Sequence, residues 1–434
     1  MMKFLRTAHS PAKPLLLPLS LLVALWGVPA FSAASELVDA FNLALQNDRT
    51  YLNAQAEERL GQLDASRAGL SYLPTVFMDQ GRSAFEKTNR TTLQAVQPLV
   101  DVDKYTAYKE APVKAAYAQA SLEAKEIELT KRLFFSFDTL VKSIALRRLA
   151  LSEAEALERQ VQRAQRRFEL GYGSVMDISL AQVQHAQALA RYQSLQNDIQ
   201  LAQQKLYSMT GVNYSLIKSQ PVEELSPAAL NALLKVAAAG GAEANAPTAA
   251  EHPLILQAKE QLKLAELSMT RAKSSYLPQV NLIVRNTQFA GMSDQYQGVQ
   301  MSFPTGVSAY GMQATARAQV DVDRARRALE EVQEQLRLER ESTDWALRVN
   351  AQELVFRNSA VKVSEQNVAS TEKAYEAGIV KASDVVNAIL ASFDVRRQKL
   401  QLLISMSEQQ LLNSLNRGVS SRAALEAVSH FFSE

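Results

Sequence analysis

The tetrapeptide Ser71-Tyr72-Leu73-Pro74 occurs twice in this chain, and its second copy is Ser275-Tyr276-Leu277-Pro278, 204 residues later. Farther along, Arg167-Phe168-Glu169-Leu170-Gly171 is matched by Ala374-Tyr375-Glu376-Ala377-Gly378, 207 residues later. Landmarks that recur in one order at nearly one spacing indicate an internal repeat. The chain is therefore predicted to contain two tandem copies of one unit, residues 34–211 and 251–418.

Each copy is predicted to run as a helix, a β-hairpin, a long helix, a short turn and a second helix. The expected hairpins are residues 74–98 and 278–304, and the expected turns lie near 171–177 and 378–384. Proline, glycine and an alanine-rich run mark 212–250 as a linker with a short helix, and 419–434 forms a C-terminal tail.

The long helices are predicted from what their sequences lack. Residues 99–170 contain no glycine and a single proline near the start, and 312–377 contain neither residue. At 1.5 Å per residue such helices are about 100 Å long. Apolar residues at alternating spacings of three and four predict a coiled-coil seam: Leu129, Leu133, Phe137, Leu140, Ile144, Leu151, Ala154, Val161, Ala164 and Phe168. The expected fold class is mainly α with a small β part.

The two hairpin segments are rich in Thr, Gln, Ser and Asn with scattered apolar residues, and each begins at a proline, Pro74 or Pro278. Two strands of about ten residues with a polar loop, such as 86–90 or 291–295, fit each segment. Such strands are typical of a membrane β-barrel, although a soluble hairpin packed on a helical bundle is the alternative. Four strands cannot close a membrane barrel, and an open edge in lipid leaves backbone groups unpaired. If the hairpins enter a membrane, several chains must share one barrel.

The N-terminus has the pattern of an export signal. Lys3, Arg6 and Lys13 precede an apolar run, residues 15–28, and the small residues of 30–34 follow it. We interpret 1–33 as a signal peptide. A membrane anchor is the alternative, but the run is shorter than the ~20 residues that a spanning helix needs. The sequence predicts an exported protein.

Composition argues against an enzyme. The chain has no Cys, which excludes disulfides, thiolate catalysis and Cys-ligated metals, and its four His have no metal-site spacing. Catalytic and nucleotide-binding motifs are absent, so we expect no catalytic residues, no cofactor and no metal. With 47 basic and 45 acidic residues, nucleic-acid binding is not expected. The run Arg159, Arg163, Arg166 and Arg167 lies among glutamates and is interpreted as a solvated or partner-docking face.

The mature chain resembles the TolC-like family of outer-membrane channel-tunnels. The resemblance rests on the duplication, on the two Tyr-Leu-Pro motifs, on residues 93–99 before the long helix, and on the turn signatures 167–177 and 375–387. It implies a homotrimer in the outer membrane of a Gram-negative bacterium, in contact with outer-membrane lipid. A shared 12-stranded β-barrel, with four strands from each chain, would continue into a long α-helical coiled-coil barrel in the periplasm. The turns would lie at the periplasmic entrance, where a periplasmic adaptor protein and an inner-membrane ABC or proton-driven transporter dock.

The turn residues have roles that follow from backbone chemistry. Gly171 and Gly378 can end a long helix with a left-handed residue, which lets the chain reverse. Ser174 and Ser383 are candidate N-caps of the helices that follow.

The resemblance implies further roles at the entrance. Asp384 matches a pore-facing acidic position, so three copies would form a carboxylate ring; ordinary helix-start chemistry is the alternative. Asn387 stands where TolC has a second Asp, which predicts weaker cation selectivity. Asp177 and Tyr375 match a pair that latches the two tips together. The supporting Arg of that latch is replaced by Val380, and the adjacent Lys381 is the candidate substitute.

The expected function is a passive conduit of a tripartite export machine, opened at its periplasmic tip by the adaptor and pump. Type I protein secretion is favoured, and multidrug or small-molecule efflux is the alternative. A periplasmic coiled-coil adaptor is a third possibility, which the missing anchor and lipidation Cys disfavour.

Overall fold

The computed structural model describes residues 33–82, 89–214, 220–221, 252–274, 277–289, 291–302 and 309–433. The expected signal peptide, apart from residue 33, and most of the expected linker lie outside the described residues, as does Tyr276.

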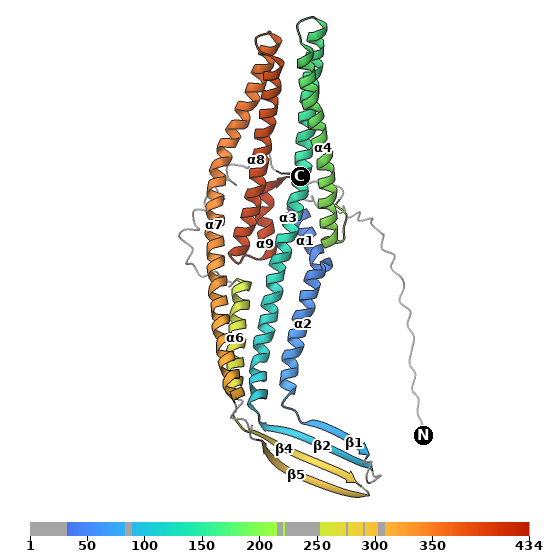
Figure 1. Ribbon diagram of the computed structural model, residues 1–434, viewed down its shortest axis with the longest axis vertical. Coiled ribbons are helices and arrows are strands. Elements are labelled where there is room, and N and C mark those ends of the chain that lie inside the picture. Colours follow the sequence, from blue (N-terminus) through green and yellow to red (C-terminus); the bar gives the residue numbers. More distant parts are fainter. Residues whose placement is uncertain are drawn as a thin grey trace, which may run out of the picture. The chain divides into compact units, whose positions relative to one another are not determined.

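The structure is mostly helical with a small sheet, as predicted (Figure 1). Its helices are α1 (Ala33–Asn47), α2 (Arg49–Leu70), α3 (Val102–Glu169), α4 (Val175–Thr210), α6 (Pro253–Ser274), α7 (Ala309–Glu376), α8 (Ala382–Asn416) and α9 (Ser421–Val428). The two long helices, α3 and α7, have 68 residues each, which at 1.5 Å per residue gives about 100 Å. We call α3 with α4 the first helical hairpin and α7 with α8 the second.

The ends of these helices follow from local capping. The Asp48 carboxylate accepts a hydrogen bond from the Tyr51 backbone N at 2.9 Å, and Asp101 does the same for Lys104 at 3.2 Å. Each bond satisfies a backbone donor that the first turn of a helix leaves free. Gly211 ends α4 in the left-handed region at φ 72°.

Four antiparallel strands form one sheet in the order β1-β2-β4-β5. They are β1 (Thr75–Arg82), β2 (Asn89–Val100), β4 (Gln279–Phe289) and β5 (Met292–Ser302), so β1 and β4 start directly after Pro74 and Pro278. The prediction of a loop at 291–295 is wrong, because residues 292–295 belong to β5. Gly291 takes φ 85°, which allows a tight turn, and pairing continues up to Phe289 with Met292. The other expected loop lies largely outside the described residues.

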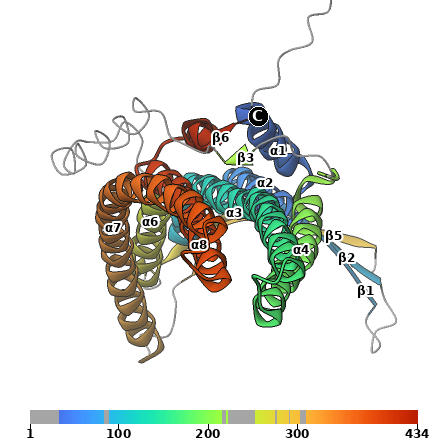
Figure 2. The same cartoon turned by 90° about the horizontal axis from the view of Figure 1, so that it is seen from above.

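The helices form two rows, one near the sheet and one near the helical turns. Toward the sheet, α2, α3, α6 and α7 are neighbours in that order; toward the helical turns, the order is α4, α3, α8 and α7. The helix α7 therefore lies at one end of both rows, and α2 or α4 lies at the other, as the view from above shows (Figure 2).

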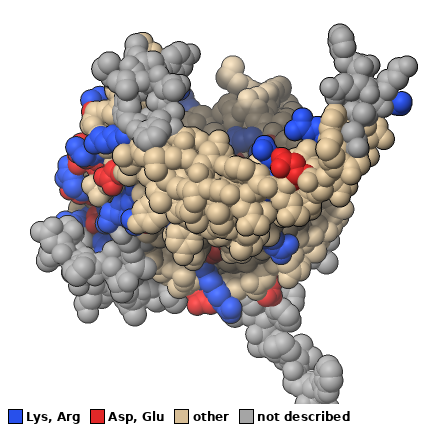
Figure 3. Space-filling view, turned by 90° about the horizontal axis from the view of Figure 1, so that it is seen from below, with Lys and Arg blue, Asp and Glu red and all other residues tan. Residues whose placement is uncertain are grey.

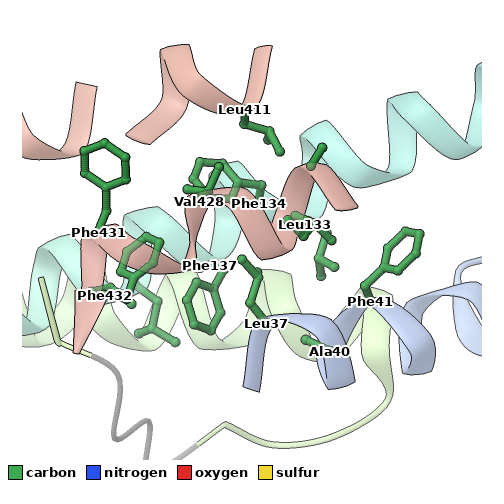
Figure 4. Close-up of a cluster of buried hydrophobic side chains, with 14 of the residues drawn as sticks. Leu37, Ala40, Phe41, Leu133, Phe134, Phe137, Leu411, Val428, Phe431 and Phe432 are labelled. Carbon is green, nitrogen blue, oxygen red and sulfur yellow. The ribbon is translucent and has the colours of Figure 1, made fainter. Parts of the chain in front are cut away.

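The main core lies midway along α3. It joins α1, α3, α4, α8 and α9 around Phe134 and Phe137, which are fully buried. The C-terminal Phe432 closes this cluster, with its ring centroid 5.8 Å from that of Phe137 in an edge-to-face arrangement (Figure 4). Phe432 is held there by a short pairing of β3 (Gln220–Pro221) with β6 (Phe432–Ser433). The tail thus fastens the middle of the helical layer, since burying one such ring is worth about 1.5–3 kcal/mol.

A second apolar cluster lies near the helical turns and joins both hairpins. Its members include Leu157 of α3, Ala181 of α4, Tyr375 of α7 and Ile389 of α8. The predicted seam is wrong at Leu151 and Phe168, whose side chains are 40% and 46% exposed. The buried face of α3 instead follows Ala150, Glu153, Ala154, Leu157, Gln160 and Ala164. In this part of the chain α3 packs against both α4 and α8, so its buried face differs from the seam of a two-helix coiled coil.

Among the described residues, no helix combines the length and the hydropathy that a membrane span requires.

Candidate functional site

Both helical hairpins turn at a glycine in the left-handed region. Gly171 has φ 80° and Gly378 has φ 77°. The turns have matching bonds: Gly171 N donates to Phe168 O at 2.9 Å, and Gly378 N donates to Tyr375 O at 3.0 Å. Non-glycine residues are strained in this region, so glycine at these two positions lets each long helix end and the chain reverse.

The return helices start with carboxylates that cap their first turns. Ser174 is the N-cap of α4, and its backbone N donates to Asp177 Oδ2 at 3.3 Å. In the second hairpin the Lys381 backbone N donates to Asp384 Oδ2 at 3.0 Å. Ser383 is not the N-cap that the sequence suggested, because α8 already starts at Ala382 and Asp384 caps it from inside the first turn. Asp177 and Asp384 therefore hold equivalent places in the two repeats.

Asp384 and Asn387 lie one turn apart on the same side of α8, and both are exposed. The residues between them, Val385 and Val386, are buried in the second apolar cluster near the helical turns, which we call the tip cluster. Packing of the two valines fixes the rotation of α8 about its axis. The carboxyl and the amide therefore face away from the tip cluster.

Tyr375 of the second hairpin contacts the first hairpin at the tip. Its side chain is 4% exposed, and the Arg167 guanidinium lies over its ring at 4.4 Å from the centroid. Arg167 Nη1 also donates to the Tyr375 carbonyl oxygen. Burial raises the pKa of the Tyr375 phenol, and the charge of nearby Asp177 adds to this, while Arg167 and Arg163 oppose it. The structure thus brings Tyr375 and Asp177 near each other, and the Asp177 carboxylate accepts a hydrogen bond from the backbone N of Ser174.

The cations at this contact come from α3. Arg163 Nη1 lies 2.7 Å from Glu372 Oε1 of α7, one turn from the Arg167–Tyr375 contact. The interpretation of the arginine run as a solvated face is therefore wrong for Arg163 and Arg167, which join the two hairpins. Lys381, the expected substitute cation, is exposed at the start of α8. Spacing places Arg163 and Arg167, four apart, on one face of their helix, and Glu372 and Tyr375, three apart, on one face of theirs. It does not show that these two faces meet.

The sheet has two chemically different faces. Strand register places Met78, Leu93, Val284 and Val299 on one face, where their side chains are largely exposed. We call this the apolar face. Alternation along the strands puts the charged residues Asp79, Arg90, Arg285 and Asp294 on the opposite face, whereas Arg82 at the end of β1 shares the apolar face. Seen from the sheet end, the broad middle of the surface shows uncharged side chains (Figure 3). An exposed apolar face of this kind requires a partner or a lipid environment.

Among the described residues, the outer strands of the sheet, β1 and β5, each pair with one neighbouring strand. A second uncovered surface lies on α7, the helix at the end of both rows. Its exposed apolar residues include Leu338, Trp345, Val349, Phe356 and Val363, which are 39–75% exposed. Successive members are four or seven residues apart, so they form one straight line on the helix. We call this line the α7 stripe. The helix α4 lies at the other end of the row near the helical turns. It also exposes apolar residues, among them Met176, Val183 and Leu201.

Comparison with known proteins gives a consistent result. Residues 40–212 match the family model described as outer membrane efflux protein. The alkaline protease secretion protein AprF of Pseudomonas aeruginosa is 22% identical, over 91% of this chain and 87% of that protein. Outer membrane protein TolC of Salmonella enteritidis is 22% identical, over 75% of this chain and 67% of its own length. The crystal structure of the outer membrane protein VceC from Vibrio cholerae matches with a TM-score of 0.76 at 15% identity, covering 89% of this chain and 97% of that one.

Proposed function

We propose that the chain belongs to the TolC-like outer-membrane efflux channels of Gram-negative bacteria, which are passive conduits and not enzymes. Within that family it would be the outer-membrane channel of a tripartite export machine. Three copies would form one channel, with a shared β-barrel in the outer membrane and a helical tunnel in the periplasm. The observation that carries this proposal is the exposed apolar face of a four-stranded sheet with two free edges.

The strand count supports sharing of the barrel. An edge strand in lipid leaves its backbone N–H and C=O groups unpaired, at several kcal/mol each. Pairing β1 of one copy with β5 of the next removes both edges, and repetition of one head-to-tail contact closes a ring. Three copies of four strands make 12, which lies in the range of natural barrels, about 8 to 26 strands. In that ring the apolar face would meet lipid and the charged face would line the lumen.

The helical layer supports the same ring. The α7 stripe at one end of the rows would face α4, and below it α2, of the next copy, so the contact is again head to tail. The contact would cover aromatic side chains, Trp345 and Phe356, that a single copy leaves in water. Both layers would then close around one axis.

At the periplasmic end the two helical turns would form the gate. Asp384 of three copies would form a carboxylate ring that favours cations, with Asn387 one turn farther along, and Gly171 and Gly378 would allow the turns themselves. The latch between the hairpins would consist of Tyr375 with Asp177 nearby and with Arg167 in the place that we expected Lys381 to fill. Opening would separate these contacts when a periplasmic adaptor and an inner-membrane ABC or proton-driven transporter engage the tip.

For the cargo we favour type I protein secretion. The support is the likeness over nearly the whole chain to a protein named for alkaline protease secretion. Small-molecule efflux is the second candidate, and the family model described as outer membrane efflux protein favours it.

The test compares culture supernatants of a deletion strain, its parent and a complemented strain by quantitative mass spectrometry. Loss of one or a few large secreted proteins, restored by complementation, is the expected result. A strain carrying Trp345→Glu serves as a matched control that retains the chain but should lack the trimer. An unchanged set of secreted proteins, with accumulation of drugs or dyes in the deletion strain, would contradict secretion and support efflux.

A further inference from the structure

Apart from the tip, a buried carboxylate with two arginine partners joins the two helical hairpins. Glu153 of α3 is 1% exposed and lies between two arginines. Arg191 of α4 donates to Glu153 Oε2 at 3.3 Å and lies 3.2 Å from Oε1, and Arg397 of α8 donates to the same Oε2 at 3.2 Å. Oε1 is buried and accepts no hydrogen bond from the described residues. The first contact lies inside the first hairpin, whereas the second crosses to the other hairpin. Glu153 is 16 residues before the end of α3, so this site lies about 24 Å from the turn.

Both partners of the crossing contact have an alternative on their own hairpin. If Arg397 moves away, Glu153 keeps Arg191. Arg397 in turn already contacts Asp394 of its own helix, with Nη1 3.3 Å from Oδ1. A buried carboxylate that loses its sole cation is strongly destabilised, because its charge is left without a partner away from water. Because Glu153 has two arginine partners, it still has one cation when the hairpins separate, and that penalty does not arise.

The exposure of the three side chains fits an exchange of partners. Glu153 is enclosed, but the side chains of Arg191 and Arg397 are 40% and 29% exposed. Water can therefore solvate either guanidinium as it leaves, while the carboxylate stays covered. A guanidinium also offers five N–H donors, so Arg397 can hold Glu153 and Asp394 together before it releases one.

We propose that Glu153, Arg191 and Arg397 form a releasable clasp between the two helical hairpins, and this rests on the proposed function because the clasp regulates opening of that channel. In the closed arrangement Arg397 holds Glu153 across the hairpins. On opening, Arg397 stays with Asp394 and Glu153 stays with Arg191. Glu153 is thus a positioning residue for the gate, and Arg191 makes its release reversible.

The two arginines are therefore expected to act in opposite directions. Arg397→Gln removes the crossing contact and leaves Glu153 paired, so the channel should open more often. Arg191→Gln leaves Arg397 as the sole cation of Glu153, so release would isolate the buried charge and the channel should open less often. A static salt bridge predicts a loss of stability in both variants and no such opposition.

The experiment measures open probability of the purified, reconstituted full-length protein in planar lipid bilayers, together with its thermal unfolding. Arg396→Gln is the matched control, because Arg396 neighbours Arg397 but pairs with Glu365 inside the second hairpin at 2.6 Å. We expect a several-fold increase for Arg397→Gln, a several-fold decrease for Arg191→Gln and wild-type behaviour for Arg396→Gln. If a glutamine variant does not fold, Arg397→Lys and Arg191→Lys should shift the open probability in the same two directions by less.

The result that overturns the clasp is a shift of both variants in one direction, or no difference between them and Arg396→Gln. A wild-type protein that forms no conducting channel would instead overturn the proposed function. The two failures are thus separate.

Discussion

Asp138 should make the stability of this protein fall as pH rises. It lies in α3 within the main core and is 1% exposed. Its Oδ1 is 3.4 Å from the hydroxyl of Ser407, and that hydroxyl already donates to Ile404 O at 2.7 Å. A serine hydroxyl has a single proton, so Ser407 can donate to only one of these two acceptors at a time and gives the Asp138 carboxylate little stabilisation. Burial, aided by the charge of Glu408, raises the pKa of Asp138 to about 8, although Lys142 acts in the opposite direction.

The sign follows from the two protonation states. Below a pH of about 4, the Asp138 carboxyl is protonated in both the folded and the unfolded chain, and the fold pays no penalty. Between about pH 4 and pH 8, the unfolded chain loses the proton while the folded chain retains it. Each pH unit then lowers the free energy of unfolding by about 1.4 kcal/mol, which amounts to roughly 4 kcal/mol at pH 7 and roughly 6 kcal/mol above pH 8. Asp138→Asn should remove this loss, because the amide stays neutral.

The assay is thermal unfolding of the detergent-solubilised protein, followed by circular dichroism at pH 4.5 and pH 8.5. We expect Asp138→Asn and wild type to unfold at similar temperatures at pH 4.5, and the variant to be clearly more stable at pH 8.5. Part of the fall in stability with rising pH should remain in Asp138→Asn, since burial also raises the pKa of Glu408. Asp198→Asn, at an exposed position of α4, is the control and should follow wild type. The reasoning is refuted if Asp138→Asn and wild type lose stability in parallel between the two pH values.

Four further outcomes are expected. Phe137→Ala should cost about 3–5 kcal/mol of unfolding free energy, measured by denaturant titration, because it leaves a cavity at a fully buried site; a loss below 1 kcal/mol would contradict the packing. Gly378→Ala should cost about 1–2 kcal/mol in the same assay, since its φ of 77° strains any residue with a Cβ. Arg167→Gln should raise bilayer conductance more than Tyr375→Phe, which keeps the ring under the guanidinium; equal effects would place the latch on the phenol hydroxyl. Trp345→Glu should abolish trimers on native gels and leave helical content unchanged, whereas intact trimers would exclude the α7 stripe as the interface.

The architecture was predictable because it depends on features that are local in the sequence. Helices of 68 residues are possible because α3 contains no glycine and a single proline, Pro112, and α7 contains no proline and a single glycine, Gly311. The repeated tetrapeptide with its proline marks where the first strand of each repeat begins. The left-handed glycines were predictable for the same reason: a helix that must reverse needs one such residue, and Gly171 and Gly378 stand at equivalent places.

The contacts between hairpins were not predictable in this way. An arginine on a helix has several possible partners, and spacing within α3 does not say that Arg163 faces Glu372 of α7. The prediction that Leu151 lies in a buried seam was wrong, because two neighbouring helices, α4 and α8, determine which residues of α3 are buried. A single coiled-coil partner would bury a different face. Glu153, a charged residue at a buried position, could be identified only when the arginines of both hairpins were placed around it.

The central claim, that several copies share one barrel through the free edges β1 and β5, can be tested with cysteines, because the chain has none of its own. Within one sheet these edges are three strand spacings apart, about 14 Å, and a disulfide needs Cα atoms within about 7 Å. Met78→Cys in β1 would be combined in turn with a cysteine at Gln295, Gln297 or Val299 of β5, all on the same face of the sheet. The account predicts that one combination oxidises in outer membranes to a covalent trimer on a denaturing gel, and that neither single cysteine does. Monomers in all three combinations, or products that stop at dimers, would contradict it.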